Sequence, residues 1–199
     1  MTYQMLRRFF RVTLLSLVRL VYRPRIQGSD SIPDEGGVLL TPNHISYIDT
    51  FILSASTKRP VRFLMDHAWY ARPIIGRFAR LFGAIPVSPD RAKDAIRTAA
   101  EALAAGDVVA IFPEGMLTND GELCGIQGGY RLIAKKGGVP VVPVRMDGLW
   151  GSAFSKAPGR RWRKAIATVA RGVDVTIDEA LSFQEATQER IASFLESKK

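Results

Sequence analysis

A histidine and an aspartate five positions apart are the residues of this chain best suited to acid–base chemistry. His44 and Asp49 follow the apolar run 38–40, which is typical of a short buried strand. Ligands of α/β sheets bind outside the carboxyl ends of the strands, so this position favours a site. An imidazole backed by a carboxylate can act as a general base, because the carboxylate selects the tautomer and stabilises the imidazolium.

The spacing of this pair leaves two interpretations open. Five residues along a regular helix turn through about 140° around its axis, so side chains at that spacing point apart. In the first interpretation a turn separates the two residues and their side chains meet. In the second, Asn43 and His44 cap a helix, and Asp49 is a favourable negative charge in its first turn.

Other reactive residues narrow what such a base would activate. No G-x-S-x-G segment surrounds Ser46, which argues against a nucleophilic serine. Cys124 is the one cysteine, so an intramolecular disulfide, a Cys-rich metal site and a C-x-x-C pair are excluded. His44 and His67 are the two histidines, too few for a structural zinc site. The base is therefore expected to act on a hydroxyl of a bound substrate.

A second candidate lies where another apolar run ends. The strand-like run 107–112 is followed by Pro113, Glu114 and Gly115. Glu114 could hold substrate hydroxyls or orient a basic side chain, and Gly115 allows a ligand to approach the backbone closely. The alternative is an ordinary strand-ending turn, in which Pro, Glu and Gly are common.

The surrounding elements alternate between strand and helix patterns, which predicts an α/β fold, a single domain with a largely parallel central sheet flanked by helices. A chain of 199 residues suits one such domain at 26–199 after a short N-terminal helix at 1–25. The capping box of Ser182 and Glu185 predicts the start of a last helix that ends near residue 197. The expected strands are 38–40, 61–65, 83–87, 107–112, 139–144 and 165–170, and the other helices include 51–53, 73–81, 90–105 and 127–136.

Positive charge gathers in two stretches that contain no acidic residue, within a formal net charge of +9. Such stretches attract polyanions, either nucleic acid or an anionic membrane surface. In the first stretch most arginines fall within an arc of roughly 120° of a helix, with apolar residues mostly opposite. The first set is Arg7, Arg8, Arg11, Arg19, Arg23 and Arg25, and the second is Lys156, Arg160, Arg161, Arg163, Lys164 and Arg171.

The first stretch predicts an amphipathic helix that lies in an anionic membrane interface. Its longest charge-free run, 12–18, is far shorter than the ~20 residues that cross a bilayer. A signal peptide and a helix that packs on its own domain remain alternatives. No nucleic-acid module is recognisable, so nucleic acid is not an expected partner. We expect a peripheral or monotopic protein at the cytoplasmic face of a membrane.

Four short sequence segments between about residues 36 and 146 are informative in their order. They are Asn43-His44 with Asp49, Gly-Ala-Ile-Pro-Val at 83–87, Phe-Pro-Glu-Gly at 112–115, and Val-Pro-Val-Val-Pro-Val at 139–144. Their joint order and spacing are highly specific, and they favour the interpretation in which His44 and Asp49 meet. The chain in this respect resembles the PlsC-like glycerophospholipid acyltransferases, a family that includes 1-acylglycerol-3-phosphate acyltransferase.

The resemblance implies an O-acyltransferase in which His44 deprotonates the free hydroxyl of a lysophospholipid, with Asp49 supporting it. The oxygen then attacks the thioester carbonyl of acyl-CoA or acyl-carrier protein. The favoured acceptor is 1-acyl-sn-glycerol-3-phosphate, which gives phosphatidic acid. No cofactor or metal is implied. The substrate-binding positions that the resemblance implies are Asn43, Arg80, Arg91, Glu114, Gly115 and Thr118.

Two departures from the family pattern keep alternatives open. The arginine of the second segment lies later in the sequence than in the family pattern, at Arg91. Leu117 stands where the third segment of the family often has an arginine. Because arginine recognises phosphate bidentately, its loss leaves room for a phosphodiester acceptor such as a lysophosphatidylethanolamine. The acyltransferases of 2-acylglycerophosphoethanolamine resemble this pattern more closely. A non-enzymatic anionic-lipid-binding protein and a hydrolase are the alternatives from other classes.

Overall fold

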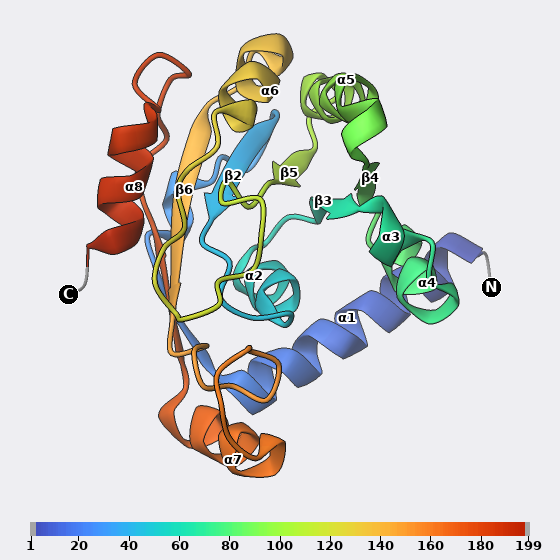
Figure 1. Ribbon diagram of the computed structural model, residues 1–199. Helices are drawn as coiled ribbons and strands as arrows, with labels where there is room; N and C mark the ends of the chain where they lie inside the picture. Colours follow the sequence, from blue (N-terminus) through green and yellow to red (C-terminus); the bar gives the residue numbers. More distant parts are fainter. Residues whose placement is uncertain (1–2, 198–199) are drawn as a thin grey trace.

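A seven-stranded sheet covered by helices makes up residues 3–197, the part of the chain that the computed structural model describes (Figure 1). Residues 1, 2, 198 and 199 of the predicted ranges 1–25 and 26–199 lie outside it. The strands are β1 (Pro24–Gln27), β2 (Val38–Pro42), β3 (Val61–Asp66), β4 (Ile85–Val87), β5 (Val108–Ala110), β6 (Val141–Asp147) and β7 (Val173–Ile177). The α-helices are α1 (Tyr3–Tyr22), α2 (Asp49–Ser56), α3 (His67–Tyr70), α4 (Pro73–Leu81), α5 (Ala92–Ala104), α6 (Gly129–Gly137), α7 (Arg161–Arg171) and α8 (Gln188–Glu196).

The sheet has the strand order β1-β7-β6-β2-β5-β3-β4. The pair of β1 and β7 and the pairs from β6 through β2, β5 and β3 to β4 are parallel, whereas β6 and β7 pair antiparallel. The predicted α/β fold with a largely parallel sheet is therefore confirmed. Because β2 and β5 are parallel neighbours, with Leu40 opposite Ala110, the segments that follow them leave the same edge of the sheet side by side.

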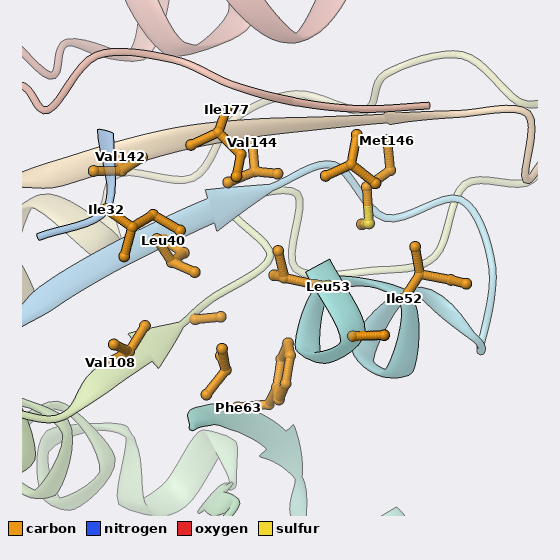
Figure 2. Close-up of a cluster of buried hydrophobic side chains, with 14 of the residues drawn as sticks. Ile32, Leu40, Ile52, Leu53, Phe63, Val108, Val142, Val144, Met146 and Ile177 are labelled. Carbon is orange, nitrogen blue, oxygen red and sulfur yellow. The ribbon is translucent and has the colours of Figure 1, made fainter. Parts of the chain in front are cut away.

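Alternate residues of the central strands supply two hydrophobic cores. Leu40 faces the core beneath α1 and α2, whereas Leu39 faces the core beneath α5, α6 and α8. In Figure 2, Ile52 and Leu53 of α2 lie against the first core beside Met146. Full burial of a leucine stabilises the fold by about 2 kcal/mol, so these side chains anchor α2 firmly on the sheet. The anchored helix begins at Asp49, which fixes one member of the candidate pair.

The run 165–170, expected as a strand, belongs instead to the helix α7. A short apolar run fits a buried strand and a helix face equally well, and periodicity alone cannot separate them. The flanking arginines and lysine are good helix formers and extend the helix to both sides. The strand that follows the helix is β7, whose alternating Val-Asp-Val-Thr-Ile pattern has every second residue buried.

The capping box of Ser182 and Glu185 forms, but the expected helix does not begin there. The Ser182 N–H donates to Glu185 Oε2 at 2.8 Å, and the Glu185 N–H donates to Ser182 Oγ at 3.3 Å. These bonds close a single turn. The helix α8 begins later, where the Thr187 hydroxyl accepts from the Arg190 N–H at 3.2 Å. A cap therefore identifies a turn more reliably than the length of helix after it.

The N-terminal helix α1 packs on the domain with one face and exposes the other. Val18 is buried in the core above α2, and the Arg19 guanidinium donates to the Ala55 carbonyl at the end of α2. The outward face leaves Phe9 and Leu20 63% and 74% exposed. The strand β1 follows at once, so the division predicted between residues 25 and 26 falls inside a strand of the sheet. No helix within residues 3–197 is long and apolar enough to cross a membrane.

Candidate active site

The loop between β2 and α2 wraps around the carboxylate of Asp49. Asp49 Oδ2 accepts hydrogen bonds from the Ile45 N–H at 2.7 Å and the Ser46 N–H at 2.8 Å. The same oxygen lies 2.9 Å from His44 Nδ1. A turn at residues 47–48 reverses the chain between the two side chains, as their meeting required. Of the two interpretations of the spacing, the structure has the one in which histidine and aspartate are in contact.

This contact decides the tautomer of the imidazole. An ionised carboxylate can only accept, so Nδ1 carries a proton, and in the neutral imidazole Nε2 is then the lone-pair acceptor. The His44 side chain is 19% exposed, whereas the Asp49 side chain is fully buried. The ring can therefore reach a substrate at the surface, while the aspartate touches only the protein.

Burial sets the electrostatics of Asp49. Desolvation raises the pKa of this carboxyl, and His44 and the two backbone N–H groups counter the shift in part. The other oxygen, Oδ1, is also buried and has no hydrogen-bond partner among the described residues. An ionised carboxylate in such surroundings interacts strongly with a positive charge that forms beside it. The carboxylate is therefore placed to stabilise positive charge that develops on the imidazole during a reaction.

Phe112 fixes the plane of the imidazole, a role that the sequence does not reveal. Its ring stacks on His44 with centroids 3.9 Å apart and an interplanar angle of 17°. Phe63 of β3 stacks behind it at 6.1 Å. Phe112 opens the third of the four sequence segments, which is the one signal of its position. An aromatic residue at a strand end suits the core equally well, so the stacking could not be read from the sequence.

Glu114 ties the loops after β2 and β5 together. Its Oε1 accepts from the His44 backbone N–H at 2.6 Å, and its Oε2 accepts from the Cys124 N–H at 2.8 Å. The Thr118 N–H adds a bond to the His44 carbonyl at 3.0 Å. Burial raises the pKa of Glu114, and the backbone donors of Cys124 and His44 counter that shift in part. Both carboxylate oxygens are thus engaged by the protein backbone.

Three other predicted substrate-binding residues also serve the local backbone. The Asn43 side chain forms paired hydrogen bonds with the main chain of Met146 on β6, at 2.8 and 3.1 Å. The Thr118 hydroxyl is buried and accepts from the Gly121 N–H at 3.1 Å within its own loop. Gly115 has φ +71°, a conformation that residues with a side chain rarely adopt. These residues hold the two loops in place around His44 and Asp49.

The two predicted arginines lie in other elements. The Arg80 guanidinium, in the last turn of α4, lies 5.6 Å from the centroid of the Tyr70 ring. Arg91 follows β4, with its side chain 80% exposed and 3.7 Å from Asp94. The strand β4 is separated from β2 by β5 and β3, which is about 14 Å at the usual strand spacing. The sheet order therefore separates Arg91 from His44.

A lysine that the sequence did not single out for the site contacts the loop that carries Leu117. Lys156 Nζ donates to the Leu117 carbonyl at 3.0 Å and to Asn119 Oδ1 at 2.7 Å. Leu117 itself is buried. This segment therefore has a cation beside it, although its own side chain is apolar. Only the fold could reveal the contact, since 39 residues separate Lys156 from Leu117.

A cavity of about 100 Å³ borders the site residues on the side of α8. Asn43, Ile45 and Glu114 line it together with Leu123 and Leu195. Typical ligand pockets measure roughly 300–1,000 Å³, so this cavity cannot enclose a lipid. The accessible part of the site is the exposed side of the imidazole.

The chain is similar to known acyltransferases. A family model described as Acyltransferase matches residues 23–147. The chloroplastic 1-acyl-sn-glycerol-3-phosphate acyltransferase BAT2 of Brassica napus is 30% identical over 131 residues, which are 64% of this chain and 38% of that protein. The 1-acyl-sn-glycerol-3-phosphate acyltransferase of Bacillus subtilis is 24% identical over 126 residues, 62% of each chain. The chain thus spans about two fifths of the chloroplastic relative and three fifths of the bacterial one.

The fold has a solved counterpart. The crystal structure of the 1-acyl-sn-glycerophosphate acyltransferase PlsC from Thermotoga maritima superposes with a TM-score of 0.73 at 21% identity. The match covers 98% of this chain and 78% of that one. The residues matched by the family model include the whole candidate pair, the Glu114 segment and the central strands. The chain belongs to the acyltransferase family.

Proposed function

We propose that this protein is an O-acyltransferase that moves a fatty acyl group from an acyl thioester to the free hydroxyl of a lysophospholipid. The donor is acyl-CoA or acyl-carrier protein, and the preferred acceptor is 1-acyl-sn-glycerol-3-phosphate, which becomes phosphatidic acid. The observation that carries the proposal is the exposed imidazole of His44 held by a buried Asp49 carboxylate. The names of the similar plant and bacterial proteins support the choice of acceptor.

The chemistry needs one base that later becomes an acid. Nε2 of His44 takes the proton of the acceptor hydroxyl as the oxygen attacks the thioester carbonyl, and the imidazolium is stabilised by Asp49. The tetrahedral intermediate collapses, the carbon–sulfur bond breaks, and the thiolate takes the proton from His44. An ester and a free thiol result, with His44 and Asp49 restored. No cofactor and no covalent enzyme intermediate enter this sequence.

Positive charge near the site supports an acceptor that carries phosphate. Lys156 lies against the loop of residues 117–119, and Thr118 of that loop is bonded to the His44 carbonyl. A lysine ammonium is a suitable point charge for phosphate, although it lacks the bidentate geometry of arginine. Arg80 and Arg91 remain predicted contacts of the charged parts of the substrates.

We further propose that the enzyme binds an anionic membrane surface through α1. The outward face of this helix exposes large apolar side chains, among them Phe9 and Leu20, on a helix without acidic residues. Replacing both with serine should weaken binding to anionic vesicles, because the apolar anchorage is lost while the charge is unchanged. Co-sedimentation with vesicles measures the effect. Equal binding of the variant and the original protein would contradict this role of α1.

The exchange His44→Ala tests the catalytic proposal. We expect acyl transfer to fall on the order of 10²-fold or more, because the base is removed, while vesicle binding is unchanged. The measurement uses purified protein, a labelled acyl thioester and a panel of lysophospholipids. His67→Ala is the matched control, since the second histidine is exposed on α3 and should leave the rate unchanged.

The same panel separates the alternatives. Preference for lysophosphatidylethanolamine would favour a phosphodiester acceptor, and free fatty acid as the product would favour a hydrolase. Lipid binding without transfer to any acceptor would favour a non-enzymatic lipid-binding protein. If the acyl-transfer rate is unchanged in both His44→Ala and His67→Ala, the assignment of His44 as the base is overturned.

A further inference from the structure

The helix α7 has an inner face that is fixed to the domain and an outer face that is not. Thr168 is buried, and Lys164 donates from Nζ to the Ser155 and Ala157 carbonyls at 3.3 and 2.6 Å. Trp162 and Ile166, one turn apart and therefore on the same side, are 57% and 63% exposed. The helix thus presents an apolar stripe on a rigidly held backbone.

Positive charge surrounds this stripe. No acidic residue occurs between Asp147 and Asp174 in the sequence. The Arg163 guanidinium lies 5.1 Å from the centroid of the Trp162 ring. Among the ion pairs of the part of the chain that the structure describes, none involves the exposed arginines of this helix and its cap. Those arginines are Arg160, Arg161, Arg163 and Arg171.

The end of α7 is also bound to the segment that follows α1. The Arg23 guanidinium donates to the Val169 carbonyl at 2.9 Å, and the Arg25 guanidinium donates to the Arg171 carbonyl at 3.1 Å. These bonds satisfy two of the carbonyls that a helix leaves unpaired at its C-terminus. In Figure 1, α7 lies beside the C-terminal end of α1, away from α5 and α6. The two basic helices therefore form one connected part of the surface.

We propose that α7 is a second membrane-binding element, whose Trp162–Ile166 stripe enters the interface of an anionic bilayer while its arginines contact lipid phosphates. An amphipathic helix with tryptophan on its apolar side and arginine around it is suited to this interface. Nucleic acid would match the charge but would leave the apolar stripe without a partner. This contact of α7 adds to the membrane binding proposed for α1 and is independent of acyl transfer.

Vesicle partitioning of the full chain tests the inference. The double variant Trp162→Ser/Ile166→Ser should bind anionic vesicles on the order of ten-fold more weakly, since the apolar insertion is lost. The double variant Arg160→Gln/Arg163→Gln should lose about five-fold per arginine on vesicles that contain phosphatidylglycerol. On pure phosphatidylcholine it should bind like the original protein.

A matched control comes from the opposite layer of the molecule. Leu132 on α6 is 45% exposed, and Lys136 is an exposed cation on the same helix. The variant Leu132→Ser/Lys136→Gln removes similar groups and should leave vesicle binding unchanged. Partitioning of the α7 variants equal to the original protein, or an equal loss in this control, would overturn the inference.

Fluorescence adds a direct measurement of insertion. The part of the tryptophan emission that is lost in Trp162→Phe belongs to Trp162. Brominated lipid should quench this part in the original protein, and an absence of quenching would contradict insertion. Duplex DNA is the second probe, and loss of DNA binding in the arginine variant with unchanged vesicle binding would assign the surface to nucleic acid.

Transfer to a short-chain lysophosphatidate dissolved as monomers is assayed in each variant. Absence of transfer in every protein would contradict the proposed function but would leave the vesicle result interpretable.

Discussion

At the scale of single residues, His44 is held by three groups that act on different parts of it. Asp49 binds Nδ1, Phe112 stacks on the ring, and Glu114 accepts from the backbone N–H. The carboxylate selects the tautomer, the aromatic ring fixes the plane, and the glutamate fixes the main chain. A base that is oriented before substrate arrives loses little freedom in the transition state.

The variant Asp49→Asn should retain the orientation of His44 while losing the negative charge. The Ile45 and Ser46 N–H groups hold an oxygen at the position of Oδ2, so the amide oxygen should face Nδ1 and the tautomer should persist. We expect steady-state turnover to fall on the order of 10²-fold, because the imidazolium is no longer stabilised by a carboxylate. Turnover within a few-fold of the original protein would show that the charge of Asp49 does not assist the base.

The same variant should change the pH dependence of stability. Burial raises the pKa of Asp49, so the folded protein holds this proton to higher pH than the unfolded chain does. Stability therefore falls as pH rises above the ordinary aspartate range near about 4, and the variant lacks this contribution. Its melting temperature, relative to the original protein, should rise between acidic and neutral pH. A falling difference would contradict the sign.

At the scale of elements, the site depends on the adjacency of β2 and β5. Each strand ends at the same edge of the sheet, and Glu114 joins the loop after one to the loop after the other. These contacts make Glu114 a clamp between the loops, and the substrate contact that the sequence resemblance implies stays a prediction. Because both oxygens accept from backbone donors, its removal should disturb catalysis through the position of His44.

Comparison of Glu114→Gln with Glu114→Ala distinguishes a clamp from a substrate contact. Glutamine keeps one acceptor and alanine keeps none, and each unpaired buried N–H costs about 1–3 kcal/mol of folding stability. We expect kcat to be highest in the original protein, lower in Glu114→Gln and lowest in Glu114→Ala, with KM for the acceptor little changed. Thermal melting and steady-state kinetics measure both effects. Glu122→Gln, at an exposed side chain of the same loop, is the control, and a rise in KM alone would support a direct contact with substrate.

At the scale of the whole molecule, basic residues gather in stretches that contain no acidic residues. The formal net charge of +9 arises mainly in the two acid-free stretches. The helices α1 and α7 lie within these stretches, and Arg23 and Arg25 join them into one connected surface. A protein of this kind should approach an anionic membrane with that surface first. The apolar side chains on the same helices would then hold it there.

Salt should therefore weaken vesicle binding in a way that depends on lipid charge. Raising ionic strength from 0.1 M to 1 M shortens the screening length from about 10 Å to about 3 Å, which removes most attraction between exposed arginines and lipid phosphates. We expect binding to phosphatidylglycerol-containing vesicles to fall steeply over this range. The weaker binding to phosphatidylcholine should change little. Binding to anionic vesicles that does not respond to salt would show that the basic surface is not in contact with them.

Local patterns in the sequence were sufficient for much of this protein. The helix expected at 73–81 is α4 with the same bounds. Pro73 suits a first helical position, and such a start signal depends only on residues close by in the sequence. The joint order and spacing of the four segments, which include His44, Asp49 and Glu114, were enough to indicate a site and a family, since side-chain chemistry belongs to the residue itself. The apolar runs before them predicted the strands that lead into the site.

Contacts between distant segments were decided only by the tertiary structure. The sheet order places Glu114 against the His44 main chain and leaves Arg91 three strands away, a difference that sequence spacing does not contain. The stacking of Phe112 on His44 and the approach of Lys156 to Leu117 also join segments far apart in the chain. The run 165–170 became helix because packing resolves what a short apolar run leaves undecided. Sequence periodicity acts over one or two turns, whereas the partners of a side chain depend on which strands become neighbours.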